Sequence, residues 1–139
     1  MAGLRQAPEF LSPVISRVDI AWICVATGDP SPLHLDERFA TSLGHRSVVV
    51  PGTMVLGWLG QYLEEWAGGQ KNLRHWKLRF TSPVWPDEQL KFSGKAAKEE
   101  STEAGHYCEV EVEVTALDGR TVAKASARFA VPAEDGATK

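Results

Sequence analysis

The sequence is poor in cysteine, in long apolar runs and in charge of one sign, and each shortage excludes a class of protein. Its two cysteines, Cys24 and Cys108, lie far apart without Cys-x-x-Cys spacing, which argues against a disulfide framework and a cysteine zinc site. We expect both thiols to be buried as small apolar groups. The 15 basic and 18 acidic residues give a net charge of −3, so the chain lacks the basic surplus that binds nucleic acid.

Hydrophobic segments are also short. No apolar run approaches the length that crosses a bilayer, and the first nine residues lack the apolar stretch of a secretory signal. We therefore expect a cytoplasmic protein without nucleic-acid or membrane partners. With 139 residues, 43% of them hydrophobic and 24% charged, the chain has the composition of one globular domain over residues 1–139. The polar end, about 132–139, is predicted to be a flexible tail.

Helix signals occupy the first half of the chain. Ser16 and Asp19 resemble a helix N-cap pattern and predict a short helix over 17–27. Two prolines then predict a loop over 29–35, because each lacks an N–H and restricts the preceding residue. Asp36 is predicted to cap a brief helix over 37–42.

A longer amphipathic pattern follows Pro51. Apolar residues recur in steps of one and three up to Trp66, which predicts a helix of about fifteen residues ended by Gly68. Gly57 and Gly60 lower helix propensity inside it, so we expect another element to pack closely against the backbone there.

After this helix the hydrophobic period becomes two. Four alternating segments predict half-buried antiparallel strands, and Asp118 with Gly119 predicts a hairpin turn between the last two. The fold class is therefore α+β, with one antiparallel sheet wrapped around the long helix so that their apolar faces meet. The edges of such a sheet favour a dimer that continues it. The strand segments are centred on Trp76–Phe80, Leu90–Phe92, Cys108–Val114 and Ala123–Phe129.

The segment between the first two helices holds the residues most suited to catalysis. Asp29 and His34 are a carboxylate and an imidazole in a loop that two prolines stiffen, and a catalytic pair needs rigid placement. Fully extended, the two residues would be about 17 Å apart, so they can act together only if the loop bends. The alternative is that Asp29 caps a turn and His34 lies on the surface.

The start of the long helix offers a second chemical group. The first turn of a helix has backbone N–H groups without partners, which can stabilise a developing oxyanion. Pro51 has no N–H, so Gly52 and Thr53 are the candidate donors.

These segments together resemble a known family. The run Ala-Thr-Gly-Asp-Pro-Ser-Pro-Leu-His-Leu-Asp at 26–36, followed by Pro-Gly-Thr-Met at 51–54 and a long helix, is similar to the MaoC-like or hydratase 2 group of (R)-specific enoyl-CoA hydratases. The resemblance implies a hot-dog fold and reversible addition of water to a trans-2-enoyl-CoA thioester, giving a 3-hydroxyacyl-CoA. It further implies that Asp29 and His34 are catalytic and that Gly52 is the oxyanion donor. It implies no metal and no cofactor besides the coenzyme A of the substrate.

Two residues depart from the family pattern. Ser31 stands where the family usually has Asn, so the support of the loop is altered, and Pro51 stands where it usually has His. Residues 62–68 resemble small MaoC-like subunits that act on bulky, including steroid-derived, CoA thioesters. Some of those subunits act only as heteromers, so the expected partner is a second copy or another hot-dog subunit. The expected binding residues besides the catalytic pair are Gly52, Thr53 and Ser31.

The sequence is also compatible with two other functions. Hot-dog thioesterases generally carry a carboxylate on or beside the long helix, where this chain has only Glu64 and Glu65 near the C-terminal end. A non-catalytic subunit that completes a partner's site is the other alternative. Basic residues at 71–79 and at 45–46 could meet the CoA nucleotide or could be a solvated surface or dimer contact.

Overall fold

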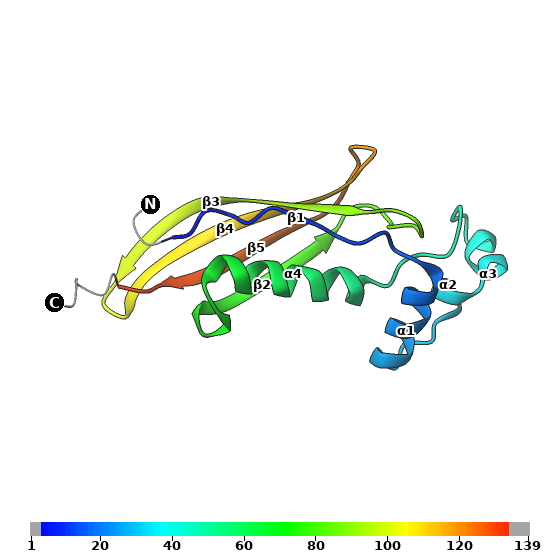
Figure 1. The fold of residues 1–139 in the computed structure, drawn as a ribbon, viewed down its shortest axis with the longest axis horizontal. Helices are drawn as coiled ribbons and strands as arrows, with labels where there is room; N and C mark the ends of the chain where they lie inside the picture. Colours follow the sequence, from blue (N-terminus) through cyan, green and yellow to red (C-terminus); the bar gives the residue numbers. More distant parts are fainter. Residues whose placement is uncertain (1–3, 134–139) are drawn as a thin grey trace.

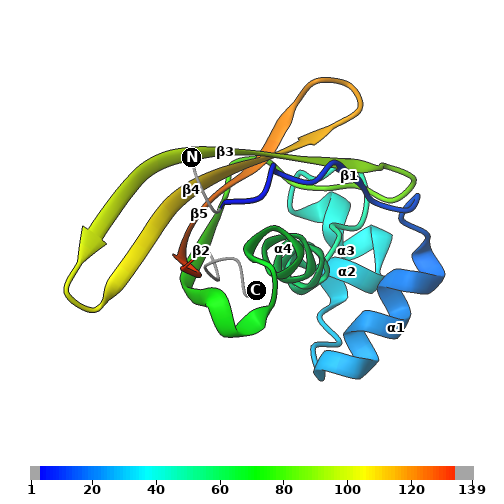
Figure 2. The ribbon, with the colours of Figure 1, turned by 60° about the vertical axis from the view of Figure 1, so that its left-hand side comes forward.

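The computed structural model describes residues 4–133, and its centre is the 16-residue helix α4, Gly52–Ala67. A sheet curves around this helix, and three short helices lie beyond its N-terminal end (Figures 1 and 2). The helix ends at Gly68, which adopts the left-handed conformation with φ of 78°. The predicted long helix and its end are confirmed.

The sheet has five antiparallel strands in the order β1-β3-β4-β5-β2. The four predicted strands are confirmed. A fifth strand, β1, was not predicted; it is two residues long and pairs with β3. The predicted α+β architecture, one antiparallel sheet around one long helix, is confirmed as well. The strands are β1 Phe10–Leu11, β2 Leu73–Phe80, β3 Leu90–Thr102, β4 Gly105–Ala116 and β5 Thr121–Val131, with a 3-10 turn η1 Gln70–Asn72 before β2.

The core lies between α4 and the concave face of the sheet. Leu59, Leu63 and Trp66 of α4 are buried, and they share one apolar cluster with Val112 of β4 and Phe129 of β5. Burying each large apolar side chain contributes about 1.5–3 kcal/mol. The alternate residues of the strands, including the glutamates of β4, are exposed on the opposite face, as the period of two predicts.

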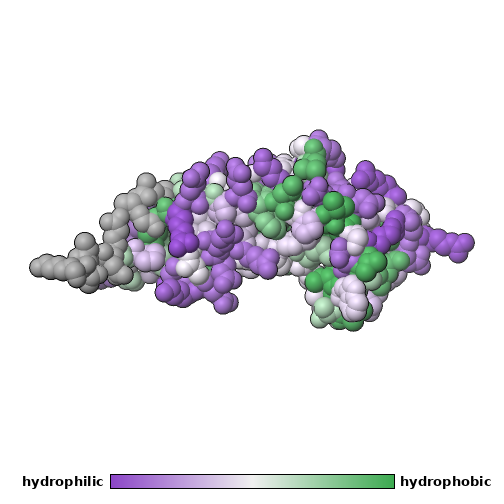
Figure 3. Space-filling model, viewed as in Figure 1, coloured by the Kyte–Doolittle hydropathy of each residue, from purple (hydrophilic) through white to green (hydrophobic). Residues whose placement is uncertain are grey.

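The first half of the chain forms the short helices. α1, Arg17–Thr27, begins with a capping box in which Ser16 and Asp19 exchange side-chain and backbone hydrogen bonds. α3, Glu37–Ser42, is capped by the Asp36 carboxylate, which accepts from two backbone N–H groups. Both helices have their predicted bounds, and α1 exposes an apolar face to solvent (Figure 3).

The predicted loop over 29–35 is wrong in its second half. Pro32–Leu35 forms the short helix α2, with Pro32 in its first turn and Ser31 as its N-cap. A proline fits this position because the first N–H groups of a helix have no partner inside the helix. Pro32 therefore starts a turn of helix.

The expectation of close packing at two glycines of α4 is also wrong. A Cβ on Gly57 would meet nothing within 4 Å, and one on Gly60 would only touch Trp76 at an ordinary 3.7 Å. Close approach occurs instead at Gly52 and Gly94.

Part of the predicted flexible tail, residues 134–139, lies outside the described residues. None of the helices within 4–133 combines the length and the apolar character that a membrane span requires.

Candidate active site

The turn between α1 and α2 brings Asp29 back toward His34. Gly28 ends α1 in the left-handed conformation with φ of 68°, and the Asp29 N–H then bonds to the Cys24 carbonyl at 2.9 Å. The single turn of α2 returns the chain, so that His34 Nε2 lies 3.6 Å from an Asp29 carboxylate oxygen. The segment from Asp29 to His34 therefore bends, as it must if the two residues are to act together.

The His34 ring is held by a backbone carbonyl. Its Nδ1 lies 2.6 Å from the Val49 oxygen. A carbonyl only accepts hydrogen bonds, so we assign the ring proton to Nδ1. In the neutral ring Nε2 then carries a lone pair and faces Asp29. The His34 side chain is 12% exposed and that of Asp29 is 51% exposed, so one partner is fixed in the fold and the other is open to solvent.

Ser31 supports this turn from its start. Its hydroxyl accepts from the Leu33 N–H at 3.3 Å, and the Leu33 carbonyl accepts from the Val49 N–H at 3.0 Å. Ser31 thus caps α2 and helps to place the strand-like segment that carries the Val49 carbonyl. It does not line the cavity next to His34.

A cavity of about 380 Å³ connects His34 with the start of α4. This volume lies within the range of small-molecule pockets, about 300–1,000 Å³. His34 and Gly52 both line this cavity. Asp29 and Thr53 do not line it, and Thr53 is exposed on the first turn of α4. Its other walls come from two segments far apart in the sequence: Val49 and Val50, and Phe80, Thr81, Ser82, Pro83 and Val84.

Gly52 lies against the ring of Phe80. A Cβ on Gly52 would lie 2.9 Å from Phe80 Cε2, closer than real Cβ atoms approach, so a side chain here would displace the ring. No side chain caps the N-terminus of α4, and Pro51 precedes it. The Met54 N–H bonds to the Pro51 carbonyl at 3.0 Å, which leaves the N–H groups of Gly52 and Thr53 as the candidate donors, and Gly52 lines the cavity.

Arg120 holds one wall of the cavity. Its guanidinium donates to the Ser82 hydroxyl at 3.0 Å, to the Pro83 carbonyl at 3.3 Å and to the Glu88 carboxylate at 2.8 and 2.9 Å. Three groups on the loop after β2 are thus fixed by the side chain of one residue, which directly precedes β5. The sequence offered no sign of this role, because the partners are brought together only by the sheet.

Cys24 is buried in the last turn of α1, next to the turn that carries Asp29. Burial, with a further contribution from the charge of Asp29, raises the pKa of its thiol. The protonated thiol is a poor nucleophile and a poor metal ligand. Within residues 4–133 no group of three or more His, Cys, Asp or Glu side chains could hold a metal ion.

The basic residues near the site differ in their surroundings. The Arg46 guanidinium carbon lies 5.0 Å from the centre of the Trp85 ring, and the His45 ring lies 5.9 Å from it. Lys77 and Arg79 of β2 are exposed on the outer face of the sheet. A role of either group at a CoA nucleotide stays a prediction.

Comparisons with known proteins agree on one family. A family model described as a MaoC like domain matches residues 3–117. The chain is 28% identical over 123 residues to the peroxisomal hydratase-dehydrogenase-epimerase of Saccharomyces cerevisiae, covering 88% of this chain and 13% of that protein. It is 38% identical over 86 residues to the 3-hydroxyacyl-thioester dehydratase Y of Mycobacterium tuberculosis, covering 60% of this chain and 30% of that protein. The chain therefore spans less than a third of the length of these curated relatives.

Solved structures give the same fold. The crystal structure of the ChsH1-ChsH2 complex from Mycobacterium tuberculosis contains a chain that matches with a TM-score of 0.76 and 21% identity. The match covers 95% of this chain and 100% of that chain. At this identity the likeness concerns the fold, which is the hot-dog fold that the resemblance implied.

Proposed function

Because the chain belongs to the MaoC-like domain family, we propose that it is a hydratase that adds water reversibly to a trans-2-enoyl-CoA and gives a 3-hydroxyacyl-CoA. The single observation that carries the proposal is the pair of Asp29 and His34, 3.6 Å apart, of which His34 lines a largely apolar cavity. One curated relative is named a hydratase and the other a dehydratase, which are the two directions of one reaction.

The pair suits a bound water. A separation of 3.6 Å is too long for a direct hydrogen bond, and with the proton on Nδ1 both facing atoms are acceptors. One water molecule can donate an O–H to each of them. Its oxygen then has a free lone pair that can attack C3 of the enoyl group.

Proton transfer completes the addition. The water oxygen bonds to C3, the C2–C3 double bond becomes single, and C2 takes a proton. Asp29 and His34 together remove the proton from water and supply the one that C2 receives, which is general acid–base catalysis. No metal or redox cofactor takes part in this proposal, since every proton and electron pair comes from substrate, water and the two side chains.

Negative charge forms on the thioester oxygen during the addition. The N–H of Gly52 is the proposed donor to this oxygen, with the positive end of the α4 dipole behind it. Thr53 is the next N–H in the same turn and is a weaker candidate, since it lies outside the cavity lining. Gly52 has no side chain that could collide with the Phe80 ring, which lines the same cavity.

Hydrolysis of the thioester is less well supported. The buried face of α4 is apolar, and both glutamates of this helix, Glu64 and Glu65, are exposed near its C-terminal end. A carboxylate on the inward face of the long helix, as in hot-dog thioesterases, is therefore lacking in α4.

The acyl group and the assembly belong to the proposal as well. The apolar cavity wall suits an acyl chain, and the resemblance of residues 62–68 favours a bulky, steroid-like one. The ChsH1-ChsH2 complex is an assembly of two subunits. By analogy we propose that this chain works with another hot-dog subunit.

The test follows the absorbance of the enoyl-thioester conjugation. Short and bulky trans-2-enoyl-CoA substrates are incubated with the wild-type chain, with Asp29→Asn and with the control Asp36→Asn. The control keeps an N-cap for α3, because Asn caps helices as well as Asp does. We expect loss of the band without release of free thiol, with wild type and Asp36→Asn only; equal rates in Asp29→Asn, or loss of the band with an equal release of free thiol, would contradict the proposal.

A further inference from the structure

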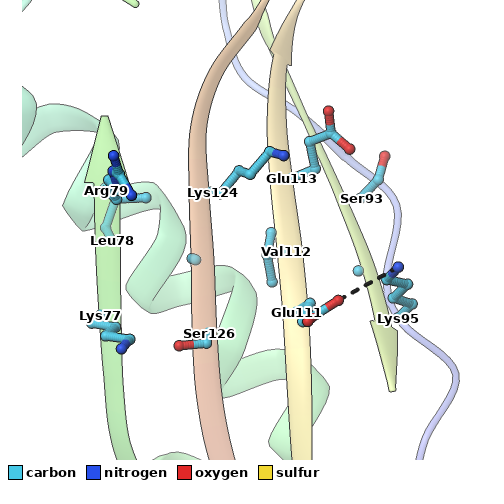
Figure 4. Close-up of a pocket in the computed structure, with 12 residues that line it drawn as sticks. Lys77, Leu78, Arg79, Ser93, Lys95, Glu111, Val112, Glu113, Lys124 and Ser126 are labelled. Atoms are coloured by element: carbon cyan, nitrogen blue, oxygen red, sulfur yellow. Dashed lines mark ion pairs between the residues drawn. The ribbon is translucent and has the colours of Figure 1, made fainter. Parts of the chain in front are cut away.

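Phe80 ends β2 on the inner face of the sheet. Lys77 and Arg79 border the hollow on the outer face that Figure 4 shows. Trp76, Leu78 and Phe80 alternate with them, so their side chains are directed toward α4. Trp76 and Leu78 pack against the apolar core, but Phe80 is 43% exposed. The last large side chain of this inner row is therefore only half-covered.

The backbone of Phe80 is fixed, but its ring is held loosely. The Thr81 N–H that follows it bonds to the Val122 carbonyl at 2.9 Å. Phe92 of β3 packs against two other aromatic rings, whereas no aromatic ring in the described part of the chain pairs with Phe80. The residue opposite Phe80 on β5 is Ala123, whose methyl group is too small to hold a ring. The ring can therefore change rotamer while its Cα stays in place.

The ring lies over the proposed oxyanion donor. A Cβ on Gly52 would be 2.9 Å from Phe80 Cε2 and 3.1 Å from its Cζ, so the ring occupies the space next to the first residue of α4. Both residues line one cavity with His34. Its volume of about 380 Å³ is near the lower end of the range for small-molecule pockets, about 300–1,000 Å³. A thioester bound by the Gly52 N–H would therefore lie beside the Phe80 ring.

Other walls of the cavity are held by hydrogen bonds. The Arg120 guanidinium holds the loop at 82–83, and the Val50 N–H bonds to the Val84 carbonyl at 2.8 Å. Moving either wall would break these bonds. The Phe80 ring can turn without breaking a hydrogen bond, so it is the part of the lining best able to yield to a substrate.

We propose that Phe80 determines the size of the acyl group that the site accepts. With its ring over Gly52, the cavity holds a short acyl chain. A bulky acyl group, such as the steroid-like one proposed above, would overlap with the ring, and such overpacking is unfavourable. It enters when the ring turns outward into solvent, which the exposed position of Phe80 allows. This assignment rests on the proposed acyl-CoA substrate, and not on the addition of water to it.

The test compares two saturated thioesters, butanoyl-CoA and 4-cyclohexylbutanoyl-CoA, which differ only by the ring at the end of the acyl chain. Neither has the enoyl double bond, so titration calorimetry measures binding without hydration. Relative to butanoyl-CoA, Phe80→Ala should bind the cyclohexyl thioester about tenfold more tightly than wild type does. Phe80→Trp should shift the ratio of the two Kd values about tenfold the other way, because the larger ring fills more of the cavity.

Phe39→Ala is the matched control. Phe39 is 39% exposed on α3 and lies outside the cavity lining, so its loss should leave the ratio of the two Kd values as in wild type. Thermal melts should place Phe80→Ala near wild type, because its ring is half-exposed. An equal change in affinity for both thioesters would place the ring against the CoA arm that they share and would overturn the proposal. An unchanged ratio in Phe80→Ala, or no binding of either thioester, would overturn it too. Loss of the enoyl band tests the reaction separately, so a failure of either proposal can be told from a failure of the other.

Discussion

Gly94 of β3 lies so close to Trp66 of α4 that a Cβ at this position would be 2.3 Å from the indole Cζ3. It would also be 2.7 Å from the Tyr62 hydroxyl. The helix and the sheet therefore meet most tightly at a residue without a side chain. A side chain on Gly94 would therefore force α4 and β3 apart or displace both rings.

Substitution of this glycine is expected to be costly. Gly94→Ala should lower the free energy of unfolding by about 3 kcal/mol, because Trp66 and Tyr62 are buried and must move together. Gly57→Ala is the matched control in open space, and it should raise stability by about 0.5–1 kcal/mol through helix propensity. Urea unfolding of both variants checks this; equal effects would mean that the contact does not limit packing.

Tyr62 is expected to make the free energy of unfolding depend on pH in the alkaline range. Burial raises the pKa of its hydroxyl to about 12, against about 10 in an unfolded chain. The folded state therefore holds the proton more strongly, so this contribution is complete below about pH 10 and is lost as the pH rises toward 12. The loss should be on the order of 2 kcal/mol. Unfolding of wild type and Tyr62→Phe between pH 9 and about 12 should give curves whose difference changes over this window; a constant difference would contradict the assignment.

Arg120 is predicted to matter for substrate binding as well as for stability. Arg120→Ala should lower the free energy of unfolding by about 1–3 kcal/mol, since its charged hydrogen bonds to Ser82, Pro83 and Glu88 are lost. The cavity wall is then less ordered, so KM should rise more than kcat falls. Arg38→Ala removes an exposed guanidinium on α3 and should change neither quantity. Steady-state kinetics and thermal melts separate the two effects, and an unchanged KM would show that the wall does not depend on Arg120.

Much of the fold could be predicted from local signals. The capping residues Ser16, Asp19 and Asp36 and the glycine at 68 mark helix ends wherever the chain lies in space. The strands follow from alternation, because one face of the sheet is buried and the other is not. β1 was not predicted, because an alternation of apolar and polar residues cannot be recognised in a strand of two residues.

The candidate site was predictable only in part. Asp29 and His34 stand in one short segment with two prolines, and the resemblance of that segment to a known family predicted them as the pair. The groups that complete the site come from elsewhere: the Val49 carbonyl, the Phe80 ring and the Arg120 guanidinium. Only the tertiary fold places them, so no local pattern could reveal them. The helix α2 was missed because a proline stops a helix in its interior but fits in its first turn.

In the proposed reaction, Asp29 and His34 act on one water molecule as a unit. The most direct test is a double-mutant cycle of kcat/KM for hydration, with Asp29→Asn, His34→Ala and the double variant. Each single change should lower kcat/KM by about 10²–10⁴-fold while the thermal melt stays near that of wild type. The double variant should be little worse than the poorer single one, because either loss already disables the pair. Wild-type rates in the single variants, or losses that multiply in the double variant, would contradict the claim.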